Sequence, residues 1–130
     1  MKKLFILFSI IFSITCYSQA HLGHTYNELE RFVGNRPIKT GFLKNGYWYA
    51  ETNYDLGKFV YCFSNDGYIV FCFQIPYNQG CVNAQAEIYN QKYSIISSNS
   101  WVAYLDGGGI MYINLVYDDG LEQFVFNYNQ

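Results

Sequence analysis

Charge is scarce in this sequence, and its balance is wrong for binding nucleic acid. Only 14% of the 130 residues are charged, and ten acidic residues outnumber eight basic ones. A surface that binds phosphate needs an excess of Lys and Arg, so we expect no nucleic-acid partner. The low charge accompanies 51% hydrophobic residues, which is typical of one packed domain and not of a disordered chain.

Histidine is also rare, which removes most forms of nucleophilic catalysis. After residue 20 the chain has only His21 and His24, and neither can join a Ser-His-Asp or Cys-His arrangement unless the start of the domain folds back. Two ligands on a flexible end would bind a metal weakly. We therefore interpret both as part of a solvated tail and expect no metal, no other cofactor and no catalytic residue.

Long hydrophobic runs are absent except at the start of the chain. Leu4 to Ile14 follows two lysines and precedes the small-x-small sequence Ser18-Gln19-Ala20. A run of this length is too short to span a bilayer, which takes about 20 helical residues. We therefore predict a signal peptide over residues 1–20, no transmembrane segment, and export of a single domain, residues 21–130, to the periplasm or the cell exterior.

The sequence also allows the exported protein to be a lipoprotein. Cys16 follows the apolar run and only partly matches a bacterial lipobox, so the alternative is an outer-membrane lipoprotein with a lipid anchor at Cys16. Removal of residues 1–20 leaves six basic and ten acidic residues, a net charge of −4. Acidic surfaces are therefore poor partners for the exported chain.

The rest of the sequence alternates between helical and strand patterns. Thr25 and Glu28 form the pattern of a capping box before a short helix over 26–33, and Asn78 to Tyr93 has the spacing of a second helix. Aromatic and branched residues between Gly-containing turns predict strands, at 47–53, 58–64, 68–75, 94–105, 110–117 and 121–128. The predicted fold is α+β: a six-stranded antiparallel sheet with two helices on one face.

The two halves resemble each other. A shift of 53 residues aligns Tyr47–Ile75 with the second half without a gap and gives six identities in 29 positions, among them Trp48 with Trp101 and Phe73 with Phe126. This pattern indicates an internal duplication. We therefore predict two αβββ units in tandem, over about 25–75 and 78–128.

Residues 23–37 resemble a known family. The sequence from Gly23 to Pro37, GHTYNELERFVGNRP, is similar to the G-x-T-x-x-(E/Q)-V-x-x-x-(L/M)-G-x-P opening of the small outer-membrane assembly lipoproteins of the SmpA/OmlA kind. Their helix-then-strands fold recurs in duplicated form in the β-lactamase inhibitor protein. The resemblance implies this architecture and binding to proteins, although those families have one more helical segment than this sequence indicates.

The cysteines after residue 20 are Cys62, Cys72 and Cys81, an odd number that leaves at least one thiol unpaired. If Asn65-Asp66-Gly67 is a three-residue turn, Cys62 and Cys72 lie on one face as diagonal neighbours, whereas a two-residue turn would place them on opposite faces. We expect buried free thiols. A disulfide between Cys81 and one of the other two is the alternative.

The same strand pairing predicts which face binds a partner. It assigns to a core beneath the helices a set that is mostly small or branched apart from two tryptophans, namely Trp48, Ala50, Val60, Cys62, Val70, Cys72, Trp101, Ala103, Ile113, Leu115, Gln123 and Val125. It leaves an aromatic face uncovered, because two helices cannot cover both sides of one sheet. That face consists of Tyr47, Tyr49, Phe59, Tyr61, Phe71, Phe73, Tyr104, Tyr112, Phe124 and Phe126.

An uncovered aromatic face of this size predicts a non-catalytic module that binds a protein, either as an inhibitor or as an envelope-assembly factor. One alternative is that the sheet curls and the aromatic face closes on itself. The other is an enzyme acting on polysaccharide or peptidoglycan, with carboxylates drawn from Glu51, Asp55 and Asp106. Two of these carboxylates would then lie about 5–10 Å apart across a cleft.

Overall fold

The computed structural model describes residues 20–105 and 109–130. Residues 1–19 of the predicted signal peptide, which include Cys16, and Asp106 lie outside the described residues. Within them, no helix has the length and apolar character needed to cross a membrane.

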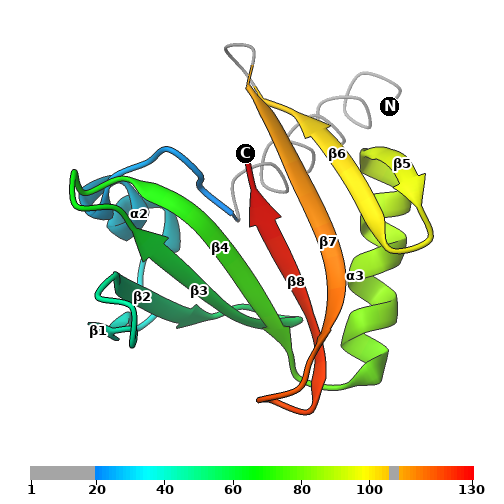
Figure 1. The fold of residues 1–130 in the computed structure, drawn as a ribbon, viewed down its shortest axis with the longest axis horizontal. Coiled ribbons are helices and arrows are strands. Elements are labelled where there is room, and N and C mark those ends of the chain that lie inside the picture. Colours follow the sequence, from blue (N-terminus) through cyan, green and yellow to red (C-terminus); the bar gives the residue numbers. More distant parts are fainter. Residues whose placement is uncertain (1–19, 106–108) are drawn as a thin grey trace, which may run out of the picture.

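The fold is α+β, with two helices and one antiparallel sheet (Figure 1). The first half contains α2 (Tyr26–Val33), β1 (Lys39–Phe42), β2 (Trp48–Asn53), β3 (Gly57–Phe63) and β4 (Ile69–Pro76). The second contains α3 (Gln79–Lys92), β5 (Ser94–Ser97), β6 (Ser100–Tyr104), β7 (Ile110–Asp118) and β8 (Gln123–Asn129). The strand order is β1-β2-β3-β4-β8-β7-β6-β5, so β4 and β8 meet at the centre.

The sheet has eight strands, so the predicted number of six is wrong. The added strands are the short edge strands β1 and β5. Two turns explain them. A turn at Asn45-Gly46, where Gly46 has φ +90°, folds β1 back onto β2, and Ser98-Asn99 divides the predicted strand 94–105 into β5 and β6. Both turns use residues that favour chain reversal.

The helices begin where the capping residues predict. The Thr25 side chain accepts a hydrogen bond from the Glu28 N–H, the Glu28 carboxylate accepts one from the Thr25 N–H, and Gly34 ends α2 with φ +63°. Asn78 caps α3 by accepting from the Cys81 N–H. Both helices lie on the same side of the sheet (Figure 1), because Leu29 of α2 and Tyr89 of α3 belong to one hydrophobic core.

The predicted sides of the sheet are right in four strands and wrong in β3 and β8. Trp48, Ala50 and Trp101 lie beneath the helices as predicted. Phe59, Tyr61 and Phe126 lie there too and are completely buried, although the sequence placed them on the uncovered face. The residues predicted for the core in their place, Val60, Cys62 and Val125, point to the other side of the sheet.

A β-bulge explains the error in the first half. Ser64 and Tyr68 pair as the three-residue turn predicts, but the register shifts between Cys62 and Phe63, so that Cys62 pairs with Phe71 and Val70 is the extra residue. A bulge changes the pairing by one residue and therefore reverses the side on which β3 residues fall. Val70 is 42% exposed and does not belong to the core.

The ungapped alignment of the two halves does not match the strand registers. Cys72 and Gln74 of β4 lie on the helix side, whereas Val125 and Asn127, which the shift of 53 residues places opposite them, lie on the other side. Each helix is followed by four strands and not by three. The duplication itself stays a prediction.

Candidate functional site

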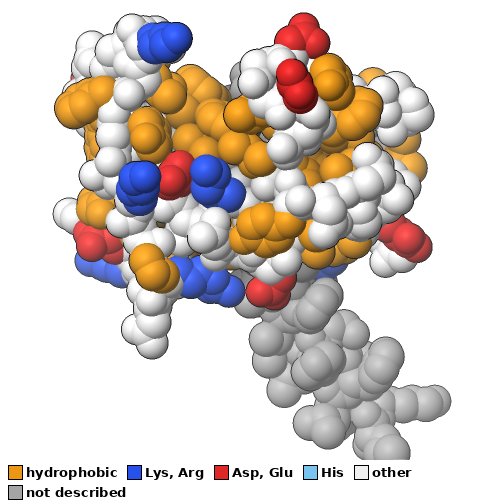
Figure 2. Space-filling model, turned by 90° about the horizontal axis from the view of Figure 1, so that it is seen from below, with side chains coloured by type: hydrophobic (Ala, Val, Ile, Leu, Met, Phe, Trp, Pro, Cys, Tyr) orange, Lys and Arg blue, Asp and Glu red, His pale blue; other side chains and the backbone are white. Residues whose placement is uncertain are grey.

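The side of the sheet away from the helices carries a set of apolar residues on both halves, which we call the open face. It consists of Tyr49, Val60, Cys62, Phe71, Phe73, Tyr104, Tyr112, Val116 and Val125, as the cross-strand pairings show. None of them belongs to the core beneath the helices. Figure 2 shows hydrophobic side chains lining a hollow between two lobes of the molecule.

Small residues form the floor of the open face and larger ones surround them. Val60, Cys62 and Val125 are 4%, 0% and 3% exposed although no helix covers them. Their cross-strand neighbours include Tyr49, Phe71 and Phe73, which are half-buried. The alternative that this face closes on itself is therefore correct only for its floor, because Tyr104, Tyr112 and Val116 remain 67%, 40% and 38% exposed.

Six of the ten predicted binding residues lie on this face or against it. Tyr49, Phe71, Phe73, Tyr104 and Tyr112 are members, and the Tyr47 ring meets Phe71 edge-on at 6.4 Å between centroids. Phe59, Tyr61 and Phe126 are in the core. Phe124 pairs with Tyr117 on the helix side, beyond the start of α3.

The second half adds amide groups that the sequence prediction missed. Asn114 and Asn127 pair across β7 and β8, and Asn127 also lies opposite Phe73 of β4. Ser100 donates a hydrogen bond to Oδ1 of Asn114 at 2.8 Å. Tyrosine and asparagine together supply rigid rings and adaptable hydrogen bonds, the combination found in protein-binding surfaces. Tyr112, Asn114 and Val116 occupy alternate positions of β7, and this spacing could have shown from the sequence that Asn114 shares a face with Tyr112.

The predicted carboxylates do not form a catalytic pair in the described part of the chain. Glu51 lies on the open side of β2, 3.5 Å from the Lys58 ammonium, and Asp55 is exposed in the turn after β2. A shallow cavity of about 200 Å³ beside Lys39, Glu51 and Lys58 has Glu51 as its one acidic lining residue. A glycosidase site needs two carboxyl groups facing each other.

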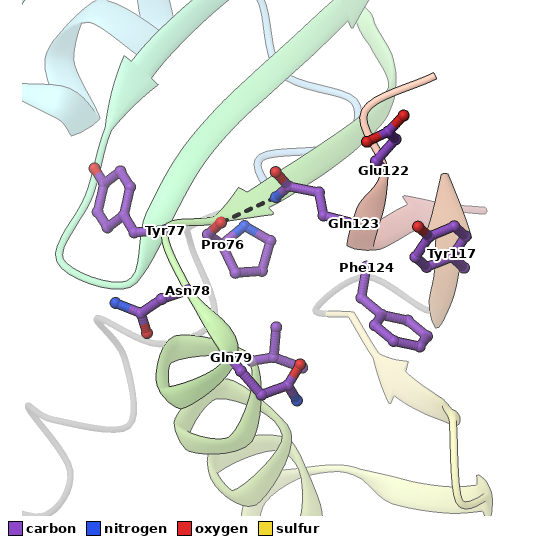
Figure 3. Close-up of a pocket in the computed structure, with 9 residues that line it drawn as sticks. Pro76, Tyr77, Asn78, Gln79, Tyr117, Glu122, Gln123 and Phe124 are labelled. Atoms are coloured by element: carbon purple, nitrogen blue, oxygen red, sulfur yellow. Dashed lines mark hydrogen bonds between the residues drawn. The ribbon is translucent and has the colours of Figure 1, made fainter. Parts of the chain in front are cut away.

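A second cavity, of about 330 Å³, lies where the end of β4, the start of α3 and the β7–β8 hairpin meet (Figure 3). Its lining combines three aromatic rings, three side-chain amides and one carboxylate, from Tyr77, Tyr117, Phe124, Asn78, Gln79, Gln123 and Glu122. Gln123 donates to the Pro76 carbonyl, and Asn78 already caps α3. This cavity therefore also lacks a pair of carboxylates.

The segment before α2 is ordered, which corrects the interpretation of His21 and His24 as a solvated tail. Gly23 donates to the Ile69 carbonyl and Ile69 donates to the His24 carbonyl, both at 2.8 Å. The His21 ring stacks on Phe32 at 4.5 Å and is 5% exposed. Burial, with a smaller contribution from His24, lowers the pKa of His21 to about 3, so its imidazole is neutral at physiological pH.

The three cysteines are free thiols in the structure, as predicted. Cys62 and Cys72 lie on opposite sides of the sheet and not on one face, because Cys62 pairs with Phe71 and Cys72 pairs with Tyr61. Burial raises the pKa of Cys62 to about 12 and that of Cys72 well above its ordinary value. A thiolate is the reactive form, so neither residue has the character of a nucleophile.

No protein-family model, curated protein or solved structure matches this chain. The likeness of residues 23–37 to the assembly lipoproteins therefore stays a prediction. The function has to be argued from the open face itself.

Proposed function

We propose that this chain is an exported, non-catalytic binding module whose open face holds a protein partner. The observation that carries the proposal is the set of apolar residues left uncovered on the hollowed side of the sheet (Figure 2). Soluble monomers rarely expose large apolar areas, and such areas are typical of interaction sites. Export follows from the predicted signal peptide, with a lipid anchor at Cys16 as the alternative form.

The shape of the open face favours a protein over a small molecule. Small ligands bind in pockets that bury most of their surface, whereas this face extends from β2 across the centre of the sheet to β6. A protein partner with a convex apolar ridge would cover the floor and the surrounding rings together. Such a partner fits either predicted role, the blocking of an enzyme or toxin or the joining of an envelope complex.

The charges around the open face indicate which charges the ridge of the partner should carry. Lys58 and Glu51 form an ion pair at the β2–β3 side of the open face, and Asp118 at the end of β7 is followed by Asp119 and Glu122 in the β7–β8 turn. We therefore infer a partner whose ridge is apolar at its centre and basic where it meets the β7–β8 turn. Complementary charge of this kind mainly sets association rate and specificity.

The test compares the open face with the helix side of the sheet. A photo-crosslinking phenylalanine analogue at Tyr112 should attach the domain, residues 21–130, to one protein of the producing cell. The same analogue at Ile95, which is 58% exposed and pairs with the helix-side residue Trp101, should not. The purified partner should bind with a Kd below about 1 µM.

Placing a lysine on the open face then tests how much this face contributes to binding of the partner. Val116→Lys should weaken binding by at least about tenfold, because a buried unpaired charge at an interface is costly, while Ile95→Lys should change it by less than about twofold. Both variants should keep the wild-type melting temperature within a few degrees, since both sites are exposed. Equal crosslinking from both positions would disprove the proposal, as would a second copy of this chain or a polysaccharide as the sole ligand.

A further inference from the structure

His21 and His24 are brought together by a tight turn. The His24 N–H donates to the His21 carbonyl at 3.1 Å, and Gly23 occupies the third position of the turn with φ +82°. Glycine adopts this conformation without strain. The turn is fixed to β4 by the two hydrogen bonds of Ile69, so both imidazoles have defined positions.

The two imidazoles differ in how their Nδ1 atoms are partnered. Nδ1 of His21 is buried and has no hydrogen-bond partner, although a buried polar atom without a partner is costly. His24 uses the other arrangement: its Nδ1 lies 2.9 Å from a carboxylate oxygen of Glu28. A carboxylate on one ring nitrogen of a histidine is the usual means of directing the other nitrogen at a metal.

The predicted cleavage after Ala20 would add a third nitrogen at the same place. His21 would then carry a free α-amine, and this amine and Nδ1 of the same residue can close a chelate ring around a metal. We propose that the cleaved chain binds one Cu²⁺ ion through the α-amine and Nδ1 of His21 and Nε2 of His24. This proposal rests on the cleavage site and is independent of the proposed protein partner.

The geometry of the two rings fits a shared ion. Their centroids are 5.9 Å apart and their planes are perpendicular. With metal–nitrogen bonds of about 2.0–2.1 Å, two imidazoles on opposite sides of one ion have centroids about 6 Å apart.

The nitrogen-only ligand set selects the metal. Imidazole and amine donors suit Cu²⁺, which such sites bind more tightly than Zn²⁺ or Ni²⁺. Among the described residues, no three His, Cys, Asp or Glu side chains form a group that could hold a metal ion. The site is therefore incomplete before cleavage, and cleavage would also remove the steric conflict at His21, whose φ of +50° is defined by the peptide bond to Ala20.

The test compares two forms of the same domain. One starts at His21 with a free amine and the other has a single alanine added before His21. Titration with CuCl₂ in the calorimeter should give one ion per chain for the first form, with at least about 100-fold higher affinity than for the second. Its electron paramagnetic resonance spectrum should show nitrogen ligands, and these can be assigned because the domain has no other histidine.

Variants separate ligation from folding. His24→Ala should weaken Cu²⁺ binding by at least about tenfold, and Glu28→Gln, as a positioning residue, by about 10–100-fold. Thr25→Ala is the matched control, because it breaks the same capping box without touching either imidazole and should leave the affinity unchanged. Equal binding by the alanine-extended form, or unchanged binding by His24→Ala, would overturn the site. So would an intact mass of the exported protein that starts at any residue other than His21.

Discussion

A chain of buried polar groups connects the sheet to α3 beneath the helices. Tyr128 donates to Oε1 of Gln74 at 3.0 Å, Nε2 of Gln74 donates to Oε1 of Gln85 at 3.2 Å, and the hydroxyls of Tyr128 and Tyr89 are hydrogen-bonded to each other. Gln74 is completely buried. Since buried polar groups are costly unless paired, this network fixes how α3 sits on β4 and β8.

Removal of one hydroxyl from this network should be expensive. Tyr128→Phe leaves Oε1 of Gln74 without the donor that Tyr128 supplies, so we expect the free energy of unfolding to fall by about 1–3 kcal/mol. Urea denaturation measures the change. Tyr117→Phe, at a ring that is 53% exposed, is the control and should change stability by less than about 0.5 kcal/mol. Equal effects of the two substitutions would contradict the role of the network.

The thiols should differ in reactivity according to burial. Cys81 is partly exposed, whereas Cys62 and Cys72 are buried and their pKa values are raised, that of Cys62 to about 12. At pH 8 a thiol-specific reagent should therefore modify one cysteine of the folded domain and three of the unfolded domain, as counted by intact mass. Rapid modification of Cys62 in the folded domain would show that the floor of the open face is not closed.

The same pKa shift has a consequence for stability. An unfolded cysteine is half ionised near pH 9, while Cys62 in the folded chain reaches half ionisation only at a pH of about 12. The folded state therefore binds more protons in this interval, and stability should fall as the pH rises from 9 toward 12. A Cys62→Ala variant should show a smaller decline in melting temperature over the same range.

At the scale of the elements, the sequence predicts where helices and strands lie far better than which side each strand presents. The capping residues Thr25 and Asn78 set the starts of α2 and α3 correctly. Strands rich in residues such as Phe59, Val60, Tyr61 and Cys62 are apolar on both sides, so the alternation that identifies the core side is missing. One bulge was then enough to reverse the assignment of β3.

The candidate site was predictable to the same degree. β4 carries apolar residues at alternate positions that all reach the open face, and Phe71 and Phe73 were therefore placed correctly. Val60 and Cys62 were placed on the wrong side. They are small, apolar and buried, and nothing in the sequence around them shows whether aromatic rings or helices cover them. Their burial depends on the curvature of the sheet, which is a property of the whole fold.

The start of β3 depends on a residue without a side chain. A Cβ at Gly57 would lie 2.6 Å from the Ile75 carbonyl oxygen and 2.9 Å from Cα of Pro76. Gly57→Ala should therefore separate β3 from β4 and destabilise the domain by about 1–3 kcal/mol or more. Gly67→Ala is the comparison: it meets no atom within 4 Å but has φ +87°, so it should cost about 1 kcal/mol. Thermal unfolding of both variants checks the order, and a greater loss for Gly67→Ala would contradict this packing.

At the scale of the whole molecule, the two halves share one core. The rings of Phe59 in the first half and Tyr128 in the second stack at 5.7 Å, and both belong to the same hydrophobic cluster as residues of α2 and α3. A core that crosses the boundary between the halves cannot be divided without exposing both sides of it. The symmetry of the strand order therefore does not make the halves independent.

Unfolding should accordingly be a single cooperative event. Calorimetric and van't Hoff enthalpies of the 21–130 domain should agree, and the separate halves, residues 21–77 and 78–130, should each give spectra of unfolded chains. Two resolved transitions, or one half that folds alone, would show that the shared core contributes less than its contacts indicate.

The seam between the halves is narrow, since β4 and β8 are paired through only three residues each, Cys72–Gln74 with Phe126–Tyr128. With so little main-chain pairing at the seam, the buried hydrogen bond between Tyr128 and Gln74, two of the paired residues, helps to hold the two walls of the hollow at a fixed spacing. The width of the hollow is therefore set in part from the opposite side of the sheet, by groups that a partner on the open face does not touch.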